Sequence, residues 1–290
     1  MENYPDTLRI KTQAGFSIVE LMVGLVIALF GILIMFQVFT SSEGIKRTTT
    51  SGGDAQQNGA SALFYVERSS KAAGYGLFSS TNVFPVPADS AAPVTINAGA
   101  GAGGSDNIVL SYRQNWYSGP FAPPQSVGFS TPPALTDETI HVAATGNLPQ
   151  LISDTAPASA GSYTYTAASA PVAATNVISE GVVLMKAEYG IDTTGTGIVS
   201  SWSQATPVNP STIKAIRVVV VARSAQPEVT VTATSGVLGA CTTTTTAPIW
   251  IDSAAIPLDL TSNLGLAAGD DWKCYRYKTF ETIVPIRNDM

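Results

Sequence analysis

The sequence predicts an α+β protein with one long helix at its N-terminal end and a β-rich region after it. Residues 21–36 form an unbroken apolar run that suits a helix, and residues 58–75 repeat apolar positions at helical spacing. Farther along the chain, short runs rich in Val, Ile, Thr and Tyr are typical of strands and alternate with loop-like stretches.

The composition is typical of a secreted or surface-exposed bacterial protein. Charged residues make up 12% of the 290 residues, against about 25% in an ordinary soluble domain. Ala, Thr, Ser and Gly replace the missing charge. The net charge is −6 and the Lys and Arg residues form no cluster, so we expect no nucleic-acid partner.

The apolar run near the N-terminus is long enough to cross a membrane. Residues 21–36 are sixteen consecutive apolar or Gly residues, and the stretch from Phe16 to Phe39 has 24 residues. As a helix this stretch would be about 36 Å long, against a hydrocarbon core of about 30 Å. A secretory signal peptide would have a shorter apolar run with a cleavage site after it. Here the polar leader comes first and ends in Ala14-Gly15.

The residues at the start of the run carry a specific motif. The order Gly15-Phe16-Ser17-Ile18-Val19-Glu20 resembles the processing motif of type IV pilins and type II secretion pseudopilins. The resemblance implies that a prepilin peptidase cuts after Gly15 and that Phe16 becomes the N-methylated first residue of the mature chain. The Lys and Arg counts on the two sides of the span are equal, so charge does not decide the orientation of the span. The resemblance implies a cytoplasmic leader, as in the pilin family.

Glu20 is the one carboxylate at the edge of this span, and a charge there is costly to bury. Insertion scales put that cost at about 2.5–3.5 kcal/mol at a helix centre. In the pilin family the corresponding glutamate pairs with the N-terminal amine of an adjacent subunit, and a buried charge is tolerable chiefly when paired. The resemblance therefore implies that Glu20 sets the axial register between stalks.

The region after the span is predicted to continue the long helix weakly. Thr48–Thr50 are β-branched and Gly52-Gly53 weakens a helix, so local composition favours a loosened or broken helix at residues 48–53. Residues 58–75 are helical again, with Ala60, Leu63 and Phe64 on one face and Val66, Ser70 and Ala73 on another. Asn58-Gly59 and Ala73-Gly74-Tyr75 resemble the end of the long helix in PilW-type minor pilins.

The rest of the chain, residues 76–290, is predicted to be a β-rich head with long loops. The candidate strands are Ile108–Tyr112, Val182–Ile191, Ile213–Ala222, Val229–Thr232 and Tyr275–Ile286. The candidate loops are Pro85–Asp106, Gly119–Pro133 and Asp154–Ala174.

The end of the chain adds to the PilW-type resemblance. Phe280-Glu281-Thr282 and Val284-Pro285-Ile286-Arg287-Asn288 are similar to the closing strand of that family. The resemblance implies a pilin-like fold, in which the C-terminal half of the long helix packs on an antiparallel sheet.

The cysteines and the histidine suit structural roles. Cys241 and Cys274 are the only cysteines, in a region expected to face the oxidising periplasm, so we predict a disulfide. It would close a loop of 34 residues, for about 3–4 kcal/mol in the chain-entropy model. With His141 they are too few for a structural zinc site, and we expect His141 to be an ordinary solvated residue. The stretch Asp192–Gly197 carries one carboxylate, too few for a calcium loop, and is predicted to be a hairpin turn.

The sequence thus predicts a minor pilin of a type IV pilus that helps to start assembly near the tip and supports adhesion, twitching motility or DNA uptake. Its expected partners are other minor pilins, the major pilin, the prepilin peptidase, the inner-membrane assembly platform and a large tip adhesin. The expected location is the inner membrane with the head in the periplasm, and the extracellular pilus after assembly. A type II secretion pseudopilin and a tip adhesin subunit are the alternatives. No catalytic motif, metal cluster or P-loop indicates an enzyme, a metal or a cofactor.

Overall fold

A computed structural model of the chain describes residues 15, 17–75, 77, 92–113, 135–145, 148–157, 175–228, 241, 243–253, 256–260 and 272–286. The chain divides into two compact units, Met1–Thr49 and Thr50–Met290.

Helix α1 spans Ile18–Ala72, and Ser17 comes immediately before its first residue. The Ser17 Oγ accepts a hydrogen bond from the Val19 N–H at 3.3 Å, as an N-terminal cap does. In the first unit, every large apolar side chain from Ile18 to Phe39 is more than half exposed. Among the described residues, α1 is the one helix long and apolar enough to cross a membrane.

Helix α1 is unbroken through residues 48–53, where local composition favoured a break. The threonine side chains fit the helix because their hydroxyls donate to carbonyls four residues earlier. Thr48 donates to the Gly44 oxygen at 3.1 Å and Thr49 to the Ile45 oxygen at 2.9 Å. These polar groups are therefore satisfied without interrupting the helix.

In the second unit, α1 packs through a row of small residues. The buried positions recur every three or four residues, which is one face of a helix: Ser51, Ala55, Gly59, Ala62, Val66, Ser70 and, just after the helix, Ala73. The predicted face with Val66, Ser70 and Ala73 is thus the packed one. The other predicted face is mixed: Leu63 is half-buried and packs against the core, whereas Ala60 is exposed and Phe64 is 67% exposed.

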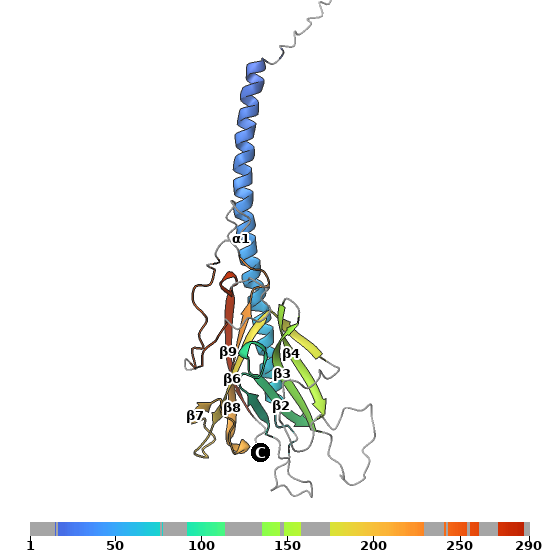
Figure 1. The fold of residues 1–290 in the computed structure, drawn as a ribbon, viewed down its shortest axis with the longest axis vertical. Helices are drawn as coiled ribbons and strands as arrows, with labels where there is room; N and C mark the ends of the chain where they lie inside the picture. Colours follow the sequence, from blue (N-terminus) through green and yellow to red (C-terminus); the bar gives the residue numbers. More distant parts are fainter. Residues whose placement is uncertain are drawn as a thin grey trace, which may run out of the picture. The chain divides into compact units, whose positions relative to one another are not determined.

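The strands form two antiparallel sheets. The first has the order β1-β2-β3-β4-β5, with β1 Val94–Asn97, β2 Asn107–Arg113, β3 Leu135–Thr145, β4 Leu148–Pro157 and β5 Thr175–Glu180. The second has the order β7-β6-β8-β9, with β6 Val182–Ile191, β7 Ser201–Ser203, β8 Ile213–Arg223 and β9 Tyr277–Pro285. Three short 3₁₀ helices complete the described elements: η1 Ala102–Gly104, η2 Pro210–Thr212 and η3 Trp272–Cys274. The prediction of an α+β fold with an antiparallel head is confirmed (Figure 1).

Most of the predicted strands agree with the structure: β2, β6 and β8 are buried on both faces, whereas β9 is mostly exposed or half-buried. Four candidates coincide with or overlap β2, β6, β8 and β9, and Val229–Thr232 lies outside the described residues. The loop predicted at Pro85–Asp106 is wrong in part, because it contains β1 and η1. Strands β3, β4, β5 and β7 were not predicted. Asp154 begins a predicted loop but lies inside β4.

Two apolar clusters hold the second unit together. The larger joins α1 to both sheets and includes Ala62 and Val66 of the helix. The smaller lies on the other face of the second sheet, where Val219 and Val221 pack with Trp250. Burial of both sheet faces explains the continuous apolar run Val218–Val221 in β8.

Candidate functional site

The predicted processing segment lies at the open start of α1. Among the described residues, no atom lies within 4 Å of the place where a Cβ on Gly15 would be. Phe16 lies outside the described residues. Glu20 is exposed in the first helical turn, where the positive end of the helix dipole favours a carboxylate.

The motif Asn58-Gly59 is where α1 meets the end of the chain. A Cβ on Gly59 would collide with the Phe280 ring of β9, so a larger residue at position 59 would require that ring to shift. The Asn58 carbonyl accepts a hydrogen bond from Ser179 Oγ of β5 at 2.8 Å. The two segments that resemble PilW-type pilins thus contact each other, and Asn58 adds a bond to the other sheet.

The motif Ala73-Gly74-Tyr75 ends the helix and attaches it to the first sheet. Gly74 has a φ of 78°, the left-handed conformation that closes helices and favours glycine. Its N–H donates to the Ser111 carbonyl of β2 at 2.9 Å. Ala73 is completely buried. This motif therefore has a structural role.

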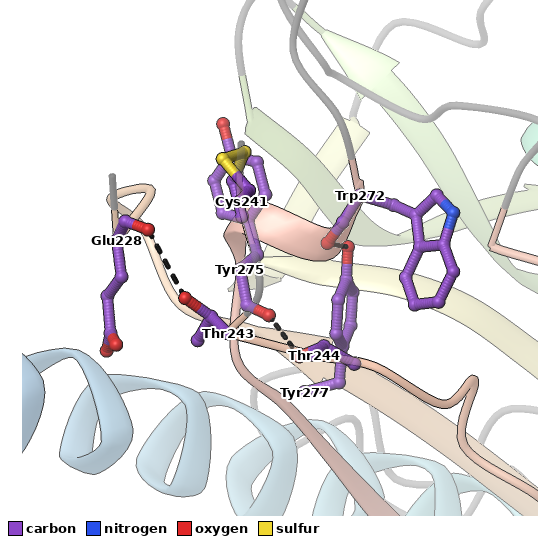
Figure 2. The surroundings of a disulfide bond; sticks show 8 residues. Glu228, Cys241, Thr243, Thr244, Trp272, Tyr275 and Tyr277 are labelled. Atoms are coloured by element: carbon purple, nitrogen blue, oxygen red, sulfur yellow. Dashed lines mark hydrogen bonds between the residues drawn. A yellow bond between two sulfur atoms is a disulfide. The ribbon is translucent and has the colours of Figure 1, made fainter. Parts of the chain in front are cut away.

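The structure joins Cys241 to Cys274, the pair expected from the sequence (Figure 2). The bond closes a loop between the two cysteines, and we call its described residues, 243–253, 256–260 and 272–273, the strap. Trp250, Leu258 and Leu260 of the strap cover the outer face of the second sheet. The disulfide thus closes the segment that covers this sheet face.

Next to the disulfide, Glu228 forms an ion pair that reaches helix α1. The carboxylate accepts two hydrogen bonds from Arg276, at 2.6 Å from Nε and 3.0 Å from Nη2. It also accepts one from Ser51 Oγ of α1 at 3.1 Å. The Arg276 hydrogen bond and charge lower the pKa of Glu228, so its ionised form is favoured.

The disulfide and the Glu228–Arg276 pair lie in the part of the chain that matches a known family. A family model described as Type IV Pilus-assembly protein W, PilW, matches residues 141–288, which is just over half of the chain. The chain belongs to the PilW family.

A solved structure similar to this PilW-family chain is a type IV-like pilin, TTHA1219, from Thermus thermophilus. The identity is 13% and the TM-score is 0.38, over 78% of this chain and 92% of that chain. No curated protein sequence matches this chain. The PilW match contains both cysteines and the Glu228–Arg276 pair, whereas the processing segment precedes it.

A buried carboxylate, Glu138 of β3, connects α1 to the first sheet of this PilW-family chain. Tyr65 donates to its Oε1 at 2.8 Å, and Ser69 and Ser153 donate to the same atom at 3.2 and 2.8 Å. Tyr112 donates to Oε2 at 3.3 Å. Burial, with the charge of Glu138, raises the pKa of Tyr112 to about 12, so this hydroxyl keeps its proton. No local pattern indicates this network, because its residues come from four different elements.

His141 of β3 is not the solvated residue predicted from the sequence. Its side chain is 14% exposed and its Nε2 lies 3.9 Å from Asp154 Oδ2. Burial lowers the pKa of His141, and the nearby Asp154 charge offsets only part of that effect. Among the described residues, no group of three or more His, Cys, Asp and Glu could hold a metal ion.

The predicted turn after β6 is a loop ordered around Asp192. The carboxylate accepts hydrogen bonds from the N–H groups of Thr194, Gly195 and Gly197 at 2.9, 2.8 and 2.6 Å. Burial alone would raise the pKa of Asp192, but these bonds outweigh it and lower the pKa to about 2. Gly195 and Gly197 both have positive φ, so the carboxylate organises a tight turn.

Proposed function

We propose that this chain is a minor pilin of a type IV pilus. The observation that carries the proposal is the pairing, in one chain, of an exposed apolar helix with a PilW-family head. From Ile18 to Phe39 each large apolar side chain is at least 51% exposed, and water disfavours so much exposed apolar surface. A membrane, and later the stalks of other pilins, would cover it.

We propose that residues 16–39 anchor the chain in the inner membrane before assembly and that the head lies in the periplasm. Cleavage after Gly15 would leave Phe16 as the first residue, with Glu20 at the fifth mature position. The open surroundings of Gly15 support access by the peptidase. The Cys241–Cys274 bond suits an oxidising compartment.

In assembly, the chain would help to start the pilus and sit near its tip, together with other minor pilins above the major pilin. The inner-membrane platform would extract it from the membrane, and adhesion, twitching motility or DNA uptake would depend on it indirectly. PilW is a pilus-assembly family rather than an enzyme family, which supports a structural role.

The decisive experiment is the mature N-terminus. We expect mass spectrometry of chains from sheared pili to find N-methyl-Phe16 at the start of a chain of 275 residues, the 290 less the leader of 15. Gly15→Ala should leave precursor in the membrane. Gly24→Ala is the matched control, because Gly24 is equally open but lies inside the span, and it should be processed normally.

An unprocessed N-terminus in assembled pili would contradict the proposal. A type II secretion pseudopilin would give the same processing, but the chain would then be absent from sheared pili and present with the secretion apparatus.

A further inference from the structure

The strap begins in a run of threonines. Residues 242–246 are five threonines, and Ala247-Pro248 follow them. Threonine favours strands, yet the described part of this run is neither helix nor strand. A threonine run beside a proline is typical of segments that carry O-linked sugars. Composition alone does not identify such a site, so the surroundings of each hydroxyl matter.

The first two described threonines attach the strap to the head. The Thr243 hydroxyl donates to the Glu228 carbonyl at 3.2 Å, and the Thr244 hydroxyl donates to the Tyr275 carbonyl (Figure 2). The Thr244 N–H also donates to the Lys273 carbonyl at 3.0 Å. These two hydroxyls therefore have structural roles and are already occupied.

The next two threonines have no such role. Thr245 and Thr246 are exposed, and among the residues that the structure describes their hydroxyls have no hydrogen-bond partner. Ala247 after them is small and exposed. Pro248 fixes its own φ and favours an extended backbone at Ala247. Two adjacent hydroxyls thus stand open to solvent on a segment whose start is attached to the head.

Exposed apolar side chains follow these hydroxyls closely. Ile249 and Ile251 are 70% and 75% exposed, whereas Trp250 between them is buried. An extended backbone produces this alternation, because successive side chains point to opposite sides. Neighbouring exposed apolar side chains on a head that water surrounds indicate that something covers them. A sugar attached a few residues earlier could do so, because one face of a sugar ring consists largely of C–H groups.

We propose that Thr245 and Thr246 are O-glycosylation sites and that the attached sugars cover Ile249 and Ile251. A transferase would supply the sugar from a lipid pyrophosphate carrier, a donor class that follows from the proposed periplasmic location of the head, on which this inference rests. The bond from the anomeric carbon to the phosphate oxygen breaks, and the phosphate keeps the electron pair. The anomeric carbon then bonds to threonine Oγ1, and a base of the transferase takes the hydroxyl proton.

The test is mass spectrometry of the full chain, purified from the membranes and sheared pili of cells that make it. Fragmentation that keeps side-chain modifications should place sugar mass on Thr245, on Thr246 or on both, and none on Thr243 or Thr244. Thr279 is the matched control, because it is exposed but lies in the paired strand β9, and it should carry no sugar. Thr245→Asn combined with Thr246→Asn should abolish the modification, whereas Thr279→Asn should leave it unchanged.

The N-terminus of the same sample separates the two proposals. An unmodified strap in a chain that begins at Phe16 would overturn the glycosylation sites and leave the pilin proposal standing. An unmodified strap in an unprocessed chain would count against both. Sugar on Thr243 or Thr244 would also overturn the assignment, because the structure uses those hydroxyls inside the head.

A second measurement tests whether the sugars cover the apolar side chains. Hydroxyl-radical labelling of Ile249 and Ile251 should be stronger in the double asparagine variant than in the parent chain, because the variant lacks the sugars. Ile198 is the control, since it is 72% exposed in another loop and should be labelled equally in both chains. Equal labelling of Ile249 and Ile251 in the two chains would overturn the covering role.

Discussion

Gly59 belongs to the Asn58-Gly59 motif, and its packing explains why a glycine suits this position. A Cβ at this position would overlap the Phe280 ring. We expect Gly59→Ala to destabilise the chain by about 1–2 kcal/mol, since overpacking costs about 1–3 kcal/mol and the better helix propensity of alanine returns up to about 1. Denaturant unfolding of the full chain, followed by tryptophan fluorescence, measures the change.

Gly53→Ala is the matched control, because a Cβ there meets no atom within 4 Å. It should raise the stability by about 0.5–1 kcal/mol. Combining Gly59→Ala with Phe280→Leu should recover part of the loss, since the smaller side chain leaves room for the methyl group. A Gly59→Ala variant as stable as the parent would show that the ring moves aside without cost.

His141 is the only histidine, the side chain whose ordinary pKa lies nearest neutral pH, so it is the first side chain to test for a stability change there. Burial holds its folded pKa below the ordinary value of 6.5. As pH falls through about 6.5, the unfolded chain therefore binds more protons than the folded chain. The free energy of unfolding is thus highest above this pH and decreases as pH is lowered through it.

We expect the denaturant concentration at the unfolding midpoint to decrease when the pH is lowered from about 7.5 to about 5.5. His141→Gln should flatten the dependence, since glutamine does not titrate in this range. An equally steep dependence in the variant would assign the effect to other groups.

At the scale of elements, three of the four strands that the sequence predicted, β2, β6 and β8, are buried on both faces, and β9 is the exception. Strands β6 and β8 are buried on both faces and read as continuous apolar runs, so their positions were clear from the sequence. Strand β3 was missed because its inward face includes Glu138, and a buried carboxylate satisfied by distant hydroxyls breaks the expected alternation.

The site divides in the same way. Gly15, Phe16 and Glu20 lie within six consecutive residues and form a motif that can be recognised in the sequence. The disulfide could also be predicted, because two cysteines allow only one pairing. The contact between Ser51 and Glu228 joins residues 177 positions apart, and nothing in either neighbourhood indicates the other. Local composition favoured a loosened or broken helix at residues 48–53, whereas helix α1 is unbroken there. The contact of Ser51 with the distant Glu228 supports the helix in a way that local composition does not indicate.

At the scale of the whole molecule, the proposed pilus role makes Glu20 a contact between subunits. Among stacked apolar stalks an unpaired carboxylate is unfavourable, and the N-terminal amine of a neighbouring subunit would compensate it. A subunit alone at the extreme tip has no stalk above it to supply that amine. Because this chain keeps Glu20, we expect it to dock beneath at least one other minor pilin.

Glu20→Ala should still insert into the membrane, because the span becomes more apolar. Pilus number should fall at least about tenfold, since breaking one buried charge pair costs about 3–5 kcal/mol. Glu20→Gln separates charge from shape, because the amide keeps hydrogen bonding without the ion pair. Glu43→Gln is the control, an exposed carboxylate on the same helix beyond the span.

Pilus counts by electron microscopy and pull-down of the other minor pilins measure the effect. If both Glu20 variants assemble and capture those pilins at parental levels, Glu20 is an interfacial glutamate without a role in register, and the docking order inferred from it fails.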